Sequence, residues 1–137
     1  MKRAIFSALV VALLVVSGYA FGPAQPGDQG KAISWDNFRA AKTSADQYDK
    51  EGKYAEALPY YLEYARQAEG LGHPDLVAWG KNNAAFTIIK RHKQDSTVDL
   101  APARKLIEEA MAIAGSTDDC RKVLATNLDY VNRWTKK

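Results

Sequence analysis

Apolar side chains recur every three or four residues along most of the chain beyond position 34, and this is the period of an α-helix. The first such segment ends at Gly52, a residue type that often terminates helices. Its apolar positions are Phe38, Ala41, Ala45 and Tyr48. A second segment begins at once, with its apolar stripe on Tyr54, Ala57, Leu58, Tyr61, Ala65 and Ala68. So short a connection predicts two helices packed antiparallel.

A third helix is predicted after the Gly- and Pro-containing break at residues 70–75. It runs from Leu76 to about Lys90 and carries apolar or small residues on almost all sides. A helix of this kind is covered by several neighbours, so we expect it to be central. The polar residues 90–99 are expected to form a loop.

Two further helices complete the predicted domain. The fourth extends from Leu100 to Gly115, with Pro102 in its first turn. Residues 116–119 offer capping side chains for a fifth. The apolar face expected for the fifth helix is Val123, Leu124, Leu128 and Val131. No segment has the alternating period of a strand, so the predicted fold class is all-α.

The first twenty residues have the layout of a secretory signal. Lys2 and Arg3 precede an apolar run at residues 4–16, and small residues occupy positions 18 and 20. We therefore expect residues 1–20 to be removed and the protein to be periplasmic or secreted. The alternative is an uncleaved membrane anchor through residues 4–22, a length just sufficient to span a bilayer.

The remaining chain divides into two parts. Residues 21–33 are rich in Gly and Pro without an apolar period, so we expect a flexible tether there. Residues 34–137 form the expected helical domain. The 137-residue chain has a net charge of +3, and the loss of two basic residues with the signal reduces this to +1. Lys and Arg alternate with Asp and Glu instead of forming one basic face, which argues against a nucleic-acid partner.

Residues with catalytic or metal-binding potential are few. His73 and His92 both lie in expected loops without a second ligand at helical spacing, so we expect no metal. No nucleophile motif and no phosphate-binding glycine loop occurs, so we expect no cofactor, no catalytic residue and no enzymatic activity. The single cysteine, Cys120, is expected to be a buried thiol or to form an intermolecular disulfide.

The stretch from residue 41 to residue 61 resembles the tetratricopeptide repeat (TPR), a helix–turn–helix unit of about 34 residues. The matching positions are Ala45, Tyr48, Gly52, Tyr54, Ala57 and Tyr61. Pro59 and the stretch "LGHPDLVAWGKNNAA" are similar to the kinesin-light-chain-type variant of this repeat. Ala125 falls at the next small position, 22 residues after Ala103. The resemblance implies antiparallel helix pairs that form a short TPR-like α-solenoid of two repeats and a closing helix.

The same resemblance implies a module that binds a protein or peptide and serves as a scaffold or adaptor in the cell envelope. Binding in this family uses the concave face, which the first helix of each pair lines. The residues that map to that face are Trp79, Asn82, Phe86, Ile89, Lys42, Arg39 and Lys122. Trp79 and Phe86 lie two turns apart and are the expected apolar anchors, although both could instead be core residues. Asp46 stands where a carboxylate-binding clamp would have Asn, which argues against that clamp.

The tyrosines of the second segment have two interpretations. Tyr54 and Tyr61 share the stripe that faces the first helix, so we expect them to pack. Tyr60 and Tyr64 lie on a neighbouring stripe and either pack or contact a ligand. Two alternatives to a peptide-binding module therefore stay open. One is a self-associating structural protein, such as a homodimer, and the other is a carrier with a small-ligand pocket under the tyrosines.

Overall fold

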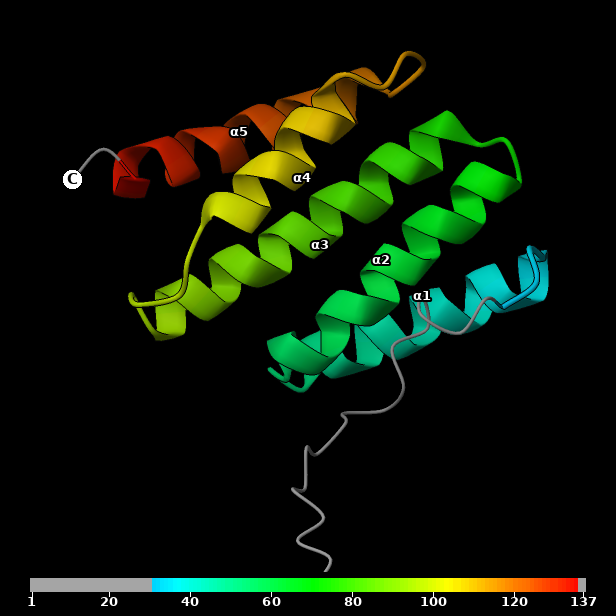
Figure 1. Ribbon diagram of the computed structural model, residues 1–137, viewed down its shortest axis with the longest axis horizontal. Helices are drawn as coiled ribbons and strands as arrows, with labels where there is room; N and C mark the ends of the chain where they lie inside the picture. Colours follow the sequence, from blue (N-terminus) through cyan, green and yellow to red (C-terminus); the bar gives the residue numbers. More distant parts are fainter. Residues whose placement is uncertain (1–30, 136–137) are drawn as a thin grey trace, which may run out of the picture.

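The computed structural model describes residues 31–135, and their regular structure is helical throughout (Figure 1). The five helices are α1 (Trp35–Lys50), α2 (Tyr54–Gly70), α3 (Pro74–Gln94), α4 (Ala101–Met111) and α5 (Asp118–Thr135). No strand occurs between residues 31 and 135, and the prediction of an all-α fold is confirmed. None of these helices is both long and apolar enough to cross a bilayer. The expected signal and most of the expected tether lie outside the described residues.

Consecutive helices run in opposite directions, with α3 in the middle of the array (Figure 1). The α2–α3 and α4–α5 turns lie at one end, and the α1–α2 and α3–α4 turns lie at the other. Helix α3 packs against α2, α4 and α5, whereas α1 packs mainly against α2. The central position predicted for the third helix is therefore confirmed. Two helix pairs, α1/α2 and α3/α4, followed by α5 form a short solenoid-like array.

The first helix pair is held together by small side chains. Ala45 of α1 and Ala57 of α2 are both fully buried, and they form one cluster with Tyr61 and with Ala84 of α3. Small residues at these positions let the helix backbones approach closely. The turn between the helices contains Gly52 at a φ of +74°, a conformation that glycine adopts without strain. The predicted antiparallel pair of α1 and α2 is thus held by the contact around Ala45 and Ala57.

Gly80 creates the closest approach between α2 and α3. A Cβ atom at position 80 would lie 2.5 Å from Cδ1 of Tyr64 and 2.9 Å from Cα of Ala65. The side chain of Tyr64 in α2 is only 4% exposed. Its ring packs on Phe38 of α1, with the ring centroids 4.5 Å apart. The missing side chain at Gly80 therefore provides the space that the tyrosine fills.

Two helix boundaries differ from the prediction. Helix α3 continues to Gln94, so the loop that was expected to start at residue 90 starts only after residue 94. The basic residues in this last turn favour a helix because they interact well with its negative end. In addition, His92 is buried, and its Nδ1 lies 2.9 Å from the hydroxyl oxygen of Tyr130 in α5. Helix α4 ends at Met111 instead of Gly115.

The buried face of α5 also differs in part from the prediction. Its buried residues are Cys120, Leu124, Asn127 and Val131, so Val123, which is 38% exposed, does not belong to the face. Ala125 is also exposed, although it follows the repeat register. The reason is that no helix follows α5 within the described residues to cover this side. Cys120 is a buried free thiol, as one of the two expectations had it, and burial raises its pKa.

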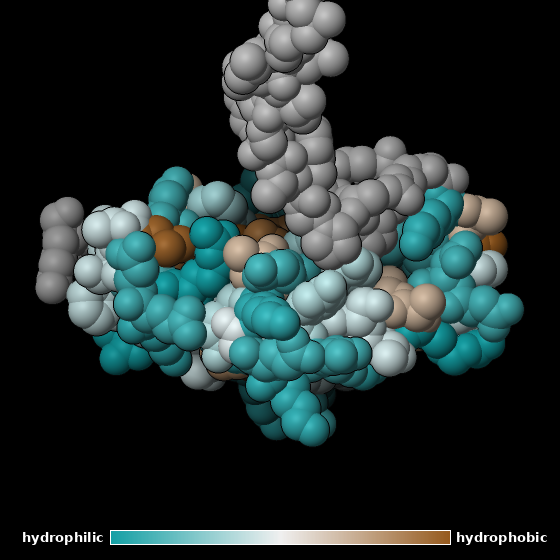
Figure 2. Space-filling view, turned by 90° about the horizontal axis from the view of Figure 1, so that it is seen from below, coloured by the Kyte–Doolittle hydropathy of each residue, from teal (hydrophilic) through white to brown (hydrophobic). Residues whose placement is uncertain are grey.

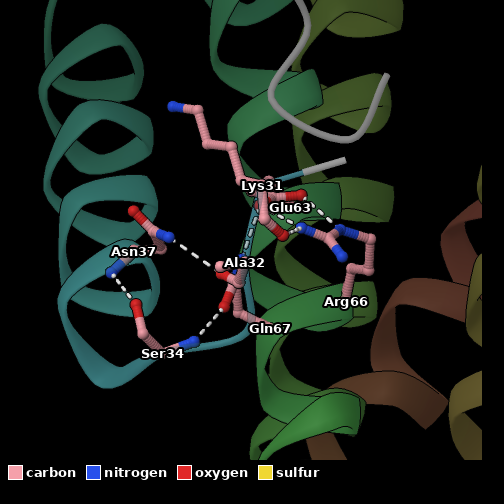
Figure 3. A network of polar contacts seen from close by, with 7 residues as sticks. All are labelled: Lys31, Ala32, Ser34, Asn37, Glu63, Arg66 and Gln67. Carbon is pink, nitrogen blue, oxygen red and sulfur yellow. Dashed lines mark hydrogen bonds and ion pairs between the residues drawn. The ribbon is translucent and has the colours of Figure 1, made fainter. Parts of the chain in front are cut away.

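Residues 31–34 lie extended along α2, where polar side chains hold their backbone (Figure 3). The amide of Gln67 donates to the carbonyl oxygen of Ala32 at 3.0 Å and accepts from the backbone N–H of Ser34 at 2.9 Å. Arg66 donates to the carbonyl oxygen of Lys31 at 2.7 Å. The last residues of the expected tether, up to Ile33, are thus attached to the helical domain. We call residues 31–34 the arm.

A buried carboxylate lies beside the arm. Glu63 is 1% exposed, and its two oxygens accept hydrogen bonds of 2.7 Å from the guanidinium of Arg66. One of these oxygens also accepts from Nε2 of Gln67 at 2.9 Å. Hydrogen bonds of this kind are what make a buried charge tolerable. They also fix the two side chains that hold the arm.

The Gly80→Ala substitution tests the close approach of α2 and α3. Alanine is normally the better helix residue by about 1 kcal/mol, but here its Cβ would collide with the backbone of Ala65. Because overpacking typically costs about 1–3 kcal/mol, we expect a net loss of stability on urea unfolding. In the control Gly70→Ala, the three atoms nearest to the new Cβ all belong to the side chain of Ile33, which is 41% exposed and can move. A Gly80→Ala protein more stable than the parent would contradict this packing.

The Gln67→Ala substitution tests the attachment of the arm. Trypsin cleaves after lysine, and the bond after Lys31 is held between the contacts of Arg66 and Gln67. We expect Gln67→Ala to accelerate cleavage after Lys31, measured by mass spectrometry as the product that begins at Ala32. Gln94→Ala at the exposed end of α3 serves as the control. Equal cleavage rates in the parent and in Gln67→Ala would mean that the arm is not held.

Candidate functional site

Two polar contacts join the first, third and fifth helices into one surface. The ammonium of Lys90 in α3 contacts both carboxylate oxygens of Asp49 in α1, at 2.6 and 2.7 Å. The side-chain amide of Asn127 in α5 donates to Oδ1 of Asn82 in α3 at 2.9 Å. We call the surface formed by α1, α3 and α5 the inner face. It corresponds to the face on which the sequence analysis expects a partner.

An aromatic platform lies on the inner face, towards the C-terminal ends of α3 and α5. Phe86 is half-buried, and the ammonium groups of Lys90 and Lys93 lie 4.7 and 5.7 Å from its ring centroid. Lys93 also lies 5.1 Å from the ring centroid of Tyr130, which belongs to α5. At these distances the cations are attracted to the ring faces. We call Phe86, Lys90, Lys93 and Tyr130 the platform.

The two platform lysines differ in their charge balance. Asp49 neutralises Lys90, and both side chains of this pair are only about one-fifth exposed. Lys93 is exposed, and among residues 31–135 no carboxylate forms an ion pair with it. Its neighbour His92 contacts the hydroxyl of Tyr130 and packs edge-on against Trp134 at 5.3 Å. These contacts hold the ring of Tyr130 in the position in which it meets the ammonium of Lys93.

Two of the predicted partner-binding residues are core residues. Asn82 is 2% exposed and Ile89 is 1% exposed. Asn82 is used in the hydrogen bond to Asn127, and Ile89 packs in the main core cluster. Neither side chain can contact a partner on the surface, so this part of the site prediction is wrong. The physical reason is that α5 covers the side of α3 to which these residues belong.

Trp79 lies between the two expected roles. It is half-buried, and it packs against the core clusters on both sides of α3. One cluster contains Phe38 and Val77, and the other contains Ile88. The tryptophan therefore contributes to packing, and only part of its ring is open to a partner.

The three basic residues predicted at the edge of the inner face are exposed. Each is paired with a carboxylate of its own helix: Arg39 with Asp36, Lys42 with Asp46, and Lys122 with Asp119. Exposed pairs of this kind typically contribute about 0–1 kcal/mol, so the cations can exchange partners.

The two tyrosines considered as ligand contacts are packing residues in this structure. Tyr64 is 4% exposed, and burial raises its pKa to about 12. Tyr60 is half-buried and stacks on Tyr48 of α1, with the ring centroids 5.5 Å apart. The hollow beside Tyr60 has a volume of about 40 Å³. Ligand pockets usually measure about 300–1,000 Å³, so this hollow offers a small molecule no room.

Three members of the platform were missed by the sequence analysis. Lys93 was assigned to a loop, Lys90 to the boundary between that loop and the third helix, and Tyr130 was assigned no role. A signal was present, because Lys90 and Lys93 follow Phe86 by four and seven residues and thus share its helix face. In residues 31–135, no group of three or more His, Cys, Asp or Glu side chains is arranged to hold a metal.

Comparisons of this chain with family models, with curated proteins and with solved structures found no match. The likeness to the TPR therefore stays a prediction from the sequence, based on Ala45, Tyr48, Gly52, Tyr54, Ala57 and Tyr61.

The Trp79→Ala and Lys93→Ala substitutions separate scaffold from surface on the inner face. Replacing a buried aromatic by alanine typically costs about 3–5 kcal/mol, and for the half-buried Trp79 we expect about 2–3 kcal/mol. An exposed residue such as Lys93 should change stability by about 0.5 kcal/mol or less. Thermal unfolding followed by circular dichroism measures both. Equal melting temperatures for Trp79→Ala and the parent would mean that Trp79 does not stabilise the fold, and they would favour its other expected role, that of a surface anchor.

Proposed function

We propose that this chain is a helical-repeat module of the TPR type that binds a protein or peptide along its inner face. The observation that carries the proposal is the platform, in which Lys93 has no ion-pair partner among residues 31–135 and lies beside the half-exposed rings of Phe86 and Tyr130. Aromatic side chains are enriched in protein interfaces, and tyrosine is among the residues that often carry much of the binding energy. Here they are already oriented by their contacts with one another, which lowers the entropy cost of binding. The exposed cations Arg39, Lys42 and Lys122 would form the polar rim.

We further propose that the module acts in the periplasm or outside the cell, as a scaffold or adaptor without catalytic activity. This part rests on the signal-like layout of residues 1–20 alone. A protein exported in this way would present the inner face to envelope or extracellular partners.

Self-association is the competing function, and the distribution of exposed apolar residues weighs against it. The large hydrophobic side chains that are exposed are Ile33, Trp35, Leu62, Met111, Val123 and Trp134. They come from the arm and from four different helices. Figure 2 shows one side of the array, where hydrophobic residues are separated by hydrophilic ones wherever grey atoms do not cover the surface. Dimer interfaces usually need a continuous apolar centre.

Site-specific photocrosslinking tests the proposed function. A benzophenone amino acid would replace Thr126, which is exposed on α5 one turn before Tyr130, or Met111, which is exposed on α4. After irradiation in an extract of the source cells, we expect a discrete adduct from position 126 and none from position 111. Adding Lys42→Glu and Arg39→Glu should weaken the adduct in a salt-dependent manner, because rim charges act mainly through long-range attraction.

The same experiment identifies the alternatives. An adduct with the mass of two copies of this chain would favour self-association. Adducts of equal yield from both positions would show that binding is not confined to the inner face.

A further inference from the structure

A cavity of about 390 Å³ opens between the C-terminal ends of α2 and α4, with the first turns of α3 between them. This volume falls within the usual range for small-ligand pockets. Its apolar wall consists of Pro74, Val77 and Ile113. None of the platform residues lines it, so it is separate from the proposed peptide site. A smaller hollow of about 140 Å³ shares Glu69, Val77 and Lys81 with the cavity and is also lined by Leu62.

One carboxylate beside the cavity forms no ion pair within residues 31–135. Lys81 and Glu109, which both line the cavity, form an ion pair with each other, and its hydrogen bond lowers the pKa of Glu109. Lys105 approaches Glu109 as well, at 3.9 Å. Glu69 also lines the cavity, is exposed, and forms no ion pair with any residue between 31 and 135. His73 completes the polar lining.

The helix ends add further negative potential. The C-terminal end of a helix carries a partial negative charge, which a basic residue in the last turn commonly offsets. Helices α1, α3 and α5 each have such a residue, whereas α2 and α4, the two helices that end at the cavity, have none. The positive N-terminal end of α3 also lies here, but Asp75 in its first turn counteracts it.

We propose that this cavity binds an organic cation, an ammonium or guanidinium group carried on an apolar stem. The cationic head lies beside Glu69 and the C-terminal carbonyls of α2, and the stem lies on Val77 and Ile113. A bound cation would offset the partial negative charge at the C-terminal ends of α2 and α4, where the last turns contain no basic residue. The apolar wall favours a ligand with an apolar stem over a bare ion. The same chemistry belongs to free amines and to the side chains of arginine and lysine in a polypeptide.

An NMR titration of the ¹⁵N-labelled protein tests this site with three probes of equal length, n-hexylamine, n-hexanol and hexanoate. We expect hexylamine to shift the backbone amide signals of Gly72, His73, Val77 and Ile113. Hexanol has the stem without the charge, and hexanoate has the opposite charge, so both should shift these signals far less at the same concentration.

Matched variants assign the head group. Exposed charge pairs contribute up to about 1 kcal/mol, so Glu69→Gln should weaken hexylamine binding about threefold to fivefold. Glu56→Gln makes the same charge change near the start of α2, away from the cavity, and should leave the affinity unchanged. Glu69 is exposed, so its substitution should not impair folding.

A second titration separates the two sources of the cation. The probe is the blocked peptide acetyl-Leu-Arg-Leu-amide, and its control is the same peptide with Gln in place of Arg. Binding of the arginine peptide assigns the cavity to a basic side chain of a polypeptide, and binding of hexylamine alone assigns it to a free amine. The proposal is overturned if neither cation shifts the cavity signals, if hexanoate shifts them as strongly as hexylamine, or if Glu69→Gln leaves the affinity unchanged.

Discussion

The packing of α2 against α3 at Gly80 is the contact on which the rest of the array depends. Because position 80 has no side chain, the backbone of α3 reaches Ala65 and leaves room for the ring of Tyr64. That ring extends to Phe38 and so connects α1 to the centre of the domain. Helices α4 and α5 then pack on the other sides of α3. The geometry of the inner face therefore depends on the α2–α3 contact at Gly80, although α2 does not belong to that face.

The number and pairing of the helices could be predicted from the sequence because they depend on local signals. Apolar spacing defines the helices, and residues such as Gly52 and Pro74 mark where the chain turns. The end of α3 could not be predicted in this way. Its last turn has no strong stop signal, and it is supported by the contact between His92 and Tyr130, which are 38 residues apart. Likewise, burial of the polar Asn127 follows from its bond across to α3.

The candidate sites show the same division. Phe86 is half-exposed on α3, whereas Asn82 and Ile89, which the repeat resemblance assigned to the same face, are buried. A register gives the direction in which a side chain points and does not say whether a later helix covers it. The pairing of Lys93 with the ring of Tyr130 arises only once α5 has packed. The cavity at the ends of α2 and α4 combines residues from three helices and has no signature in any one of them.

The most direct test of this account is a measurement of the α2–α3 contact in solution. A nuclear Overhauser spectrum reports proton pairs closer than about 5 Å, and ring currents shift the signals of protons that lie against an aromatic face. The account predicts strong cross-peaks from the α protons of Gly80 to the ring protons of Tyr64 and to the methyl group of Ala65, with a ring-current shift for Gly80. Ordinary helical shifts for Gly80 without cross-peaks to α2 would contradict the packing, and with it the arrangement of the inner face.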